Sequence, residues 1–217
     1  MTTVTASTPI TIRPARDDEY SEVARLHFSA LITNPMFELL TSKVDKLAWF
    51  KYSTEQFKQG VDSDFSSLFV AQRVDTGNLV GLAWTIMYSK DHLPKLPSGP
   101  FPEGYNRKEL ALMVAPEYQL KEEALAKYGD VMYVAKMAVS PDIQGQGIGR
   151  RLMEDIKSRA TQNGMNIILN AVSGASGFYE KLGFKVVGKP VMLADGTIEG
   201  PTPMVLVLSN EPEQSAV

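Results

Sequence analysis

The sequence predicts a single α/β domain in which strands and helices are mixed along the chain. Several short runs of aliphatic and β-branched residues are typical of strands, and amphipathic helical patterns lie between some of them. One unit stands out, because the apolar run 131–139 is followed by a loop with three glycines and then by an amphipathic helix. The chain has 217 residues, which suits one sizeable core better than two. We therefore expect one domain over residues 10–208, with flexible tails at 1–9 and 209–217.

The first part of the domain alternates strands with helical regions. From residue 10 to residue 87 we expect a strand (10–13), a helix with acidic first turns (17–31), a second helical region with a break near residue 41 (34–60), and two strands of a hairpin (67–72 and 79–87). The hairpin is predicted from the turn residues Asp75-Thr76-Gly77-Asn78 that join its strands.

Residues 88–130 form a long insert before the central strand. Prolines at 94, 97, 100 and 102 exclude a regular packed element over 88–106, so only a short helix over 116–127 is expected here. Long ordered loops in compact domains tend to be lids or binding loops.

The last part of the domain begins with that central strand. From residue 131 onward we expect a strand (131–139), a helix from residue 148, a strand (166–170), a short helix (175–182) and two final strands (184–187 and 204–208). The helix is the clearest element, because Ile148, Leu152 and Ile156 share one apolar stripe. Asp195-Gly196 predicts a hairpin turn between the final two strands.

The glycine loop has the properties of an anion-binding site. Glycines at 145, 147 and 149 allow a ligand to approach the backbone closely, and the first-turn amides of the next helix carry partial positive charge. Arg150 and Arg151 occupy the first turn without an acid, which suits a bound anion better than it suits the helix dipole. The P-loop pattern fails because no Gly-Lys-Ser/Thr follows, and the Rossmann fingerprint fails on spacing and position.

Three segments resemble the GNAT superfamily of N-acetyltransferases. Gln144-x-x-Gly147-x-Gly149 is similar to the family's acetyl-CoA motif, the stretch 178–184 to its Tyr-containing helix followed by Gly-Phe, and 10–15 to its first strand. The resemblance covers residues 9–208 and implies the GNAT fold, a mixed and mostly antiparallel twisted sheet of about six or seven strands flanked by helices. It also implies acetyl-CoA as cosubstrate. Most small members of the family connect these strands briefly, so we expect the long insert 88–130 to cover the acceptor site as a lid.

The resemblance implies roles for particular residues. Tyr179 matches the general acid that protonates the leaving thiolate, and a tyrosine with an ordinary pKa near ~10 is protonated at neutral pH. The expected cofactor-binding residues are Met137, Ala138, Val139, Gln144, Gly145, Gln146, Gly147, Ile148, Gly149, Arg150, Asn170, Ser173 and Tyr179. Asn170 or Ser173 is expected to replace a family asparagine, since Val172 stands at that position.

The general base is left open by the sequence. Aligning the glycine motif places Tyr133 where histone-type members carry a glutamate, and an ordinary tyrosine is no base at neutral pH. The remaining routes are Asp130, Glu109, another acid of the insert, a water relay, or an acceptor that needs no base.

Composition excludes several other functions. A net charge of −3 argues against a nucleic-acid binder that works by phosphate neutralisation. The absence of cysteine and the presence of only two histidines leave no metal site to expect. Residues 1–9 lack signal-peptide features and no apolar run approaches the ~20 residues that span a bilayer, so we expect a cytoplasmic protein without a membrane partner.

The sequence thus predicts an N-acetyltransferase that moves an acetyl group from acetyl-CoA to a primary amine of a small molecule. A protein N-terminal or lysine acetyltransferase is the first alternative, and a non-catalytic CoA-binding module is the second. A nucleotide enzyme ranks below both. A homodimer stays open, because family members often pair through sheet edges.

Overall fold

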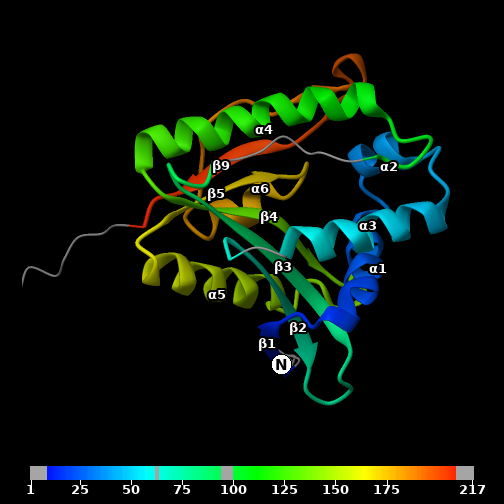
Figure 1. The fold of residues 1–217 in the computed structure, drawn as a ribbon, viewed down its shortest axis with the longest axis horizontal. Coiled ribbons are helices and arrows are strands. Elements are labelled where there is room, and N and C mark those ends of the chain that lie inside the picture. The colour runs from blue at the N-terminus through cyan, green and yellow to red at the C-terminus, as the bar shows by residue number, and fades with distance from the viewer. Residues whose placement is uncertain (1–8, 62–63, 94–99, 209–217) are drawn as a thin grey trace, which may run out of the picture.

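A seven-stranded sheet runs through the centre of the computed structural model, which describes residues 9–61, 64–93 and 100–208 (Figure 1). Its order is β1 (Ile10–Pro14), β2 (Ser66–Arg73), β3 (Leu79–Tyr88), β4 (Val131–Val139), β5 (Asn166–Ala171), β9 (Thr202–Leu206) and β6 (Lys185–Val186). Neighbouring strands are antiparallel except β4 and β5, which are parallel. The predicted fold class, a mixed and mostly antiparallel sheet flanked by helices, is confirmed. The tails 1–8 and 209–217 lie outside the described residues.

One face of the sheet is covered by α5 (Ile148–Gln162), the helix that follows the glycine loop. Its predicted stripe is fully buried against β3, β4 and β5, as the exposures of Leu152 and Ile156 (both 0%) show. The helix approaches closely because β3 carries Gly81, where a Cβ would lie 3.1 Å from a methyl carbon of Leu152. The short helix α6 (Ser176–Glu180) packs into the same core through Tyr179.

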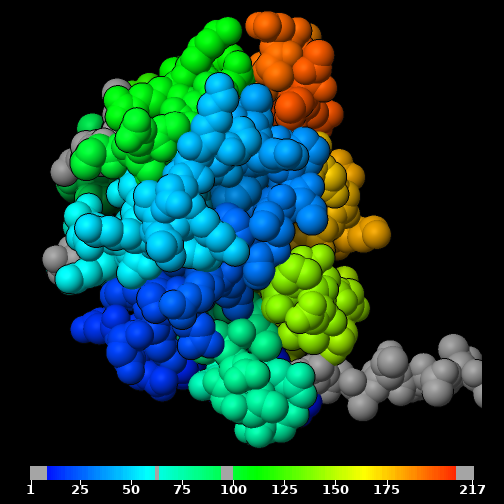
Figure 2. Space-filling model, turned by 90° about the vertical axis from the view of Figure 1, so that its right-hand side faces the viewer, coloured from blue at the N-terminus to red at the C-terminus, as the bar shows by residue number. Residues whose placement is uncertain are grey.

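The other face is covered by α1 (Tyr20–Leu31), α3 (Lys46–Val61) and α4 (Arg107–Tyr128). The first two pack against β2, β3 and β4, and α4 packs against β4 and β5. Figure 2 shows α1 to α3 in blue and cyan, between α4 in green and the teal β2–β3 turn. Among the described residues, no helix is long and apolar enough to cross a membrane.

The second helical region breaks near residue 41, as predicted. Helix α2 (Pro35–Thr41) begins at Asn34, whose side-chain oxygen accepts from the Met36 amide at 3.0 Å. Helix α3 begins after Asp45, whose carboxylate accepts from the Ala48 amide at 2.9 Å. Each of these polar side chains satisfies amides that have no partner within the helix.

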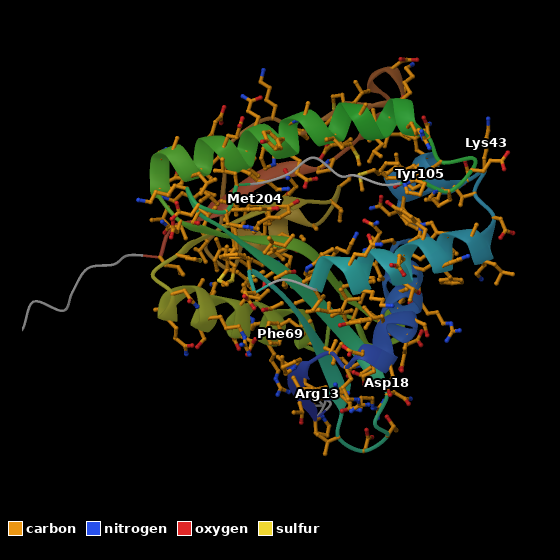
Figure 3. The ribbon with its side chains drawn as sticks, in the orientation of Figure 1. Arg13, Asp18, Lys43, Phe69, Tyr105 and Met204 are labelled. Atoms are coloured by element: carbon orange, nitrogen blue, oxygen red, sulfur yellow. The ribbon has the colours of Figure 1, made fainter. Side chains whose placement is uncertain are left out.

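The helix of the insert is longer than the sequence predicts. A start at Pro116 was expected, but α4 begins at Arg107 and runs for 22 residues, with Pro116 inside it. Asn106 caps the true start, because its side chain accepts from the Glu109 amide at 3.3 Å. The Asn106 amide also donates to the Leu40 carbonyl at 3.0 Å, which ties α4 to the end of α2, where Figure 3 labels Lys43 and Tyr105. This tertiary bond and the cap explain why the helix begins nine residues early.

The turn at Asp195-Gly196 also differs from the prediction. β6 and β9 pair as expected, but the turn belongs to a separate two-stranded sheet of β7 (Met192–Leu193) and β8 (Ile198–Glu199). Leu193 in this small sheet is fully buried and packs with Met36 and Leu40 of α2. The segment therefore folds outward to meet α2 rather than turning directly from β6 into β9.

Candidate active site

The two parallel strands separate halfway along the sheet. β4 and β5 pair from Val131/Asn166 to Val134/Leu169, and their pairing ends there. Beyond this point β4 continues beside β3, while β5 continues beside β9. A cleft of about 610 Å³ lies at the separation and is lined from both sides, by Met137 to Val139 on β4 and by Val172 and Ser173 after β5. The edge of β4 that faces β5 therefore carries unpaired backbone groups next to the cleft.

The glycine loop closes one end of this cleft. Gly145 and Gly147 have φ of +78° and +82°, a backbone conformation that strongly favours glycine. The Gln144 side chain secures the loop, because its Nε2 donates to the Val139 carbonyl at 3.1 Å. Gly147 is the N-cap residue of α5 and makes no side-chain cap. The first-turn amides of α5 are thus available, and no acid lies in that turn.

The two arginines of this turn make different contacts, so the prediction that both suit a bound anion is wrong for Arg151. Arg150 lines the cleft, as expected of a cation beside an anion site. Arg151 instead donates from Nη2 to the Ile10 carbonyl of β1 at 2.9 Å. Arg151 therefore links β1 to α5 by a hydrogen bond, and of the two arginines only Arg150 contributes its charge to the cleft.

Most of the expected cofactor-binding residues line the same cleft. They are Met137, Ala138, Val139, Gln144, Gly145, Gly147, Ile148, Gly149, Arg150, Ser173 and Tyr179. Gln146 lies on the loop but does not line the cleft, and neither does Asn170. Asn170 lies on the opposite face of the sheet, because its neighbours Leu169 and Ala171 point into the α5 core. Of the two replacements considered for the family asparagine, only Ser173 is in position.

Apolar residues outside the expected cofactor-binding set complete the lining. Ala30 and Leu31 come from the end of α1, and Phe178 comes from α6. Val172, which stands in place of the family asparagine, also lines the cleft. Ala30 and Leu31 carried no local signal for a site, because ordinary apolar residues reveal one only when the chain brings them together.

Tyr179 is positioned by aromatic packing. The centre of its ring lies 5.0 Å from the ring centre of Phe178 and 5.6 Å from that of Phe184, and both contacts are edge-on. The side chain is 8% exposed yet lines the cleft. Burial raises the pKa of Tyr179 to about 12, so its hydroxyl is a hydrogen-bond donor throughout the physiological range.

A polar group of residues lies on the opposite face of β4. Burial raises the pKa of Tyr133 well above its usual value, and the negative charge of Glu117 on α4 adds to that effect. This Glu117 carboxylate pairs with Lys121 of the same helix at 2.6 Å. The Lys121 ammonium lies 4.1 Å from the centre of the Tyr133 ring. Glu117 is therefore an acid of the insert that reaches the central strand.

The two acids named from the sequence are placed differently. Asp130 is exposed just before β4. Glu109 is buried and accepts from the Ala194 amide at 2.9 Å, so it holds the small β7–β8 sheet against α4. No described residue of the insert lines the 610 Å³ cleft, so a lid role for 88–130 stays a prediction, and its residues 94–99 lie outside the described part.

Comparisons with known proteins identify the fold. Among solved structures, the chain is similar to an arylalkylamine N-acetyltransferase-like 5b protein from mosquito (TM-score 0.67, 18% identity, 92% of this chain and 100% of that chain). It is also similar to an agmatine N-acetyltransferase mutant in its apo form (0.65, 17%, 92% and 99%) and to a Drosophila melanogaster polyamine N-acetyltransferase (0.61, 16%, 92% and 100%). The fold is therefore the acetyltransferase fold that these structures share.

The sequence itself matches a family model. Residues 106–207 match the model described as an acetyltransferase (GNAT) domain. The predicted GNAT acetyltransferase domain is therefore confirmed over residues 106–207, and the similar structures named above share its fold. A search of curated proteins found no match.

Proposed function

We propose that the protein transfers an acetyl group from acetyl-CoA to the primary amine of a small molecule. The observation that carries this proposal is the cleft between β4 and β5, which joins an uncapped helix N-terminus to an unpaired strand edge. The first feature suits a diphosphate and the second suits the amide groups of pantetheine. Both are properties of the backbone, so they fit the plain Met137-Ala138-Val139 sequence of the strand.

Different residues of the cleft would bind the diphosphate and the pantetheine of acetyl-CoA. Amides of the loop from Gly145 to Gly149, together with the Arg150 guanidinium, would hold the diphosphate. The β4 edge at Met137 to Val139 would pair with pantetheine as an added strand, and Ser173 would contact it from the β5 side. Acetyl-CoA supplies the activated thioester in this arrangement.

The reaction forms an amide N–C bond and breaks the C–S bond of the thioester. Tyr179 lines the cleft with a protonated hydroxyl, so it would donate to the sulfur as negative charge develops there. Because the pKa of Tyr179 is raised to about 12, we expect its main contribution to be a hydrogen bond that stabilises the thiolate. The amine must also lose a proton. Glu117 is the candidate acceptor of that proton, because it is the carboxylate of the insert that reaches β4 beside Tyr133.

A small amine is favoured as acceptor over a protein. The names of three structural neighbours mention arylalkylamine, agmatine and polyamine as acceptors, and each of those proteins is covered almost completely by this chain. Protein N-terminal or lysine acetylation is the competing outcome of the test below.

Isothermal titration and a thiol-release assay would test the proposal. We expect acetyl-CoA to bind the purified protein, and CoA to be released with at least one amine from a panel of arylalkylamines, polyamines, amino acids and peptides. Tyr179→Phe should lower kcat by about 10²-fold or more while leaving acetyl-CoA affinity nearly unchanged. Tyr128→Phe is the matched control, because it removes the same hydroxyl from α4, away from the cleft.

Two results would contradict the proposal. If acetyl-CoA binds but no amine in the panel releases CoA, the protein is a CoA-binding module. If only peptides are acetylated, the acceptor is a protein. Equal kcat values for Tyr179→Phe and the wild type would remove Tyr179 from the reaction.

A further inference from the structure

Strand β4 contains an irregularity that changes which side chains face which helix. Trp84 of β3 pairs with Lys136, and the next residue Thr85 pairs with Val134, so Ala135 is an extra residue in β4. Before this bulge Val134 packs in the α5 core, and after it Met137 does. Lys136 consequently lies on the face covered by α1, α3 and α4, together with Tyr133.

Lys136 has an apolar and aromatic environment on that face. Its ammonium lies 5.9 Å from the ring centres of both Phe57 and Trp84. The side chain is half-buried, and burial lowers the pKa of Lys136. Its positive charge in turn helps to depress the pKa of His27, which is buried nearby on α1. Within the described part of the chain, no carboxylate lies within 4.0 Å of the Lys136 ammonium.

The charges around this position do not balance. Glu117 is the acid that acts on Lys136, but its carboxylate is paired with Lys121 at 2.6 Å. Two ammonium groups, the buried Lys121 and the half-buried Lys136, therefore have one carboxylate between them. A partly buried charge without a close partner is unfavourable, so this arrangement favours binding of another anion.

A second donor lies on the same face. The Nδ2 of Asn170 is buried without a hydrogen-bond acceptor among the described residues. Asn170 interacts with Tyr133, and it lies on β5 just past the last residue that pairs with β4. By register, Lys136 and Asn170 thus lie on the same face of neighbouring strands, just past the last pair that joins β4 to β5. A carboxylate, with two oxygens that accept hydrogen bonds, matches these two donors.

We propose that Lys136 and Asn170 bind a carboxylate of the acceptor, so that the preferred substrates are amines that carry a carboxylate, such as amino acids. The inference rests on the proposed function, because it places the acceptor opposite the cofactor cleft. Lys136 immediately precedes the three β4 residues that line that cleft, which brings an anchored acceptor close to the acyl group. Both residues are positioning and specificity residues in this scheme, and neither takes part in bond making.

Matched pairs of acceptors test this inference directly. Each pair consists of an amino acid and the amine left after loss of its carboxylate, for example arginine with agmatine and tyrosine with tyramine. We expect the wild-type protein to acetylate the carboxylate-bearing member of at least one pair with a kcat/KM about 30-fold higher. Lys136→Met should abolish that preference by lowering activity on the amino acid alone, whereas Lys136→Arg should retain most of it.

The controls separate an anchor from a structural or proton-transfer role. Lys127→Met removes an exposed ammonium that lies over Tyr128 on α4, and it should leave the preference unchanged. Asn170→Leu should reduce the preference without reversing it. If Lys136→Met lowers activity equally on both members of every pair, Lys136 supports the fold or the proton transfer and the inference is wrong.

The remaining outcomes also decide the question. If the wild-type protein acetylates the simple amine better in every pair, the inference fails while the proposed function stands. If it acetylates neither member, the proposed function is at fault, and titration of the amino acids into the CoA-bound protein then decides. Amino-acid binding that Lys136→Met removes supports the anchor, and the absence of binding overturns it.

Discussion

Replacing Gly147 with alanine should separate the stability of the fold from its affinity for CoA. Gly147 has φ of +82°, and this backbone conformation destabilises a residue that has a Cβ by roughly 1–2 kcal/mol. A Cβ built at this position meets no protein atom within 4 Å, so no steric contribution is added. Alanine also reduces the conformational entropy of the unfolded chain, which stabilises the folded state by about 0.4–1 kcal/mol. We therefore expect Gly147→Ala to lower the free energy of unfolding by about 1 kcal/mol.

The same substitution should weaken CoA binding by a larger factor. The open space around Gly147 belongs to the cleft, at the N-terminus of α5, where the diphosphate is proposed to lie. A methyl group there would displace the phosphate from at least one amide, and a hydrogen bond to a charged group contributes about 1.5–3 kcal/mol. The dissociation constant for CoA should rise by about 10- to 100-fold. Titration calorimetry measures this change, and urea unfolding measures the stability.

Gly77→Ala provides the matched control. Gly77 has φ of +75° in the β2–β3 turn, and a Cβ there would have its nearest neighbour at 3.8 Å. The two variants should lose similar stability, but only Gly147→Ala should lose CoA affinity. Equal CoA affinity in both variants would refute the placement of the diphosphate at the start of α5.

Three further predictions follow from particular contacts. Arg150→Gln should weaken CoA binding, because Arg150 lines the cleft. Arg151→Gln should leave CoA affinity nearly unchanged and lower the thermal midpoint of unfolding, because Arg151 bonds to the Ile10 carbonyl. If calorimetry showed weaker CoA binding for Arg151→Gln than for Arg150→Gln, the placement of the site would be wrong. Because the pKa of Tyr179 is raised to about 12, its deprotonation should produce no decline in kcat below about pH 11, and a stopped-flow pH profile with such a decline would argue against its role. Hydrogen bonding from Arg13, labelled in Figure 3, lowers the pKa of buried Glu19 from 4.5 to about 2. Since the folded-state pKa is depressed, this contribution of about 3 kcal/mol is present above pH 4.5 and is lost as the pH falls towards 2. Glu19→Gln should flatten the acid limb of the stability curve measured by urea unfolding, and an unchanged acid limb would contradict the assignment.

Local patterns in the sequence determined much of the fold and the cofactor cleft. The apolar stripe of α5, the positive-φ glycines of its loop and the missing acid in its first turn are all properties of one short stretch. The physics of a helix N-terminus depends on few neighbours, so that stretch predicted its own structure and its preference for an anion. Tyr179 and Ser173, which the resemblance pointed to through the segment 178–184 and the asparagine position at Val172, also line the cleft.

The opposite face of the sheet was decided by contacts between distant segments. Counting alternate residues along β4 places Lys136 with Val134 in the α5 core, but the bulge at Ala135 moves it to the other face. That bulge depends on pairing with β3, about fifty residues earlier in the chain, and no local pattern encodes it. Glu117 reaches the strand because α4 packs against β4, which is a contact between segments that no local pattern encodes. The sequence by itself therefore determined the glycine loop and the helix start at which we propose that the cofactor lies, since these depend on backbone within one segment. The tertiary structure alone decided which side chains share the other face of the sheet, since those come from strands and helices brought together by packing.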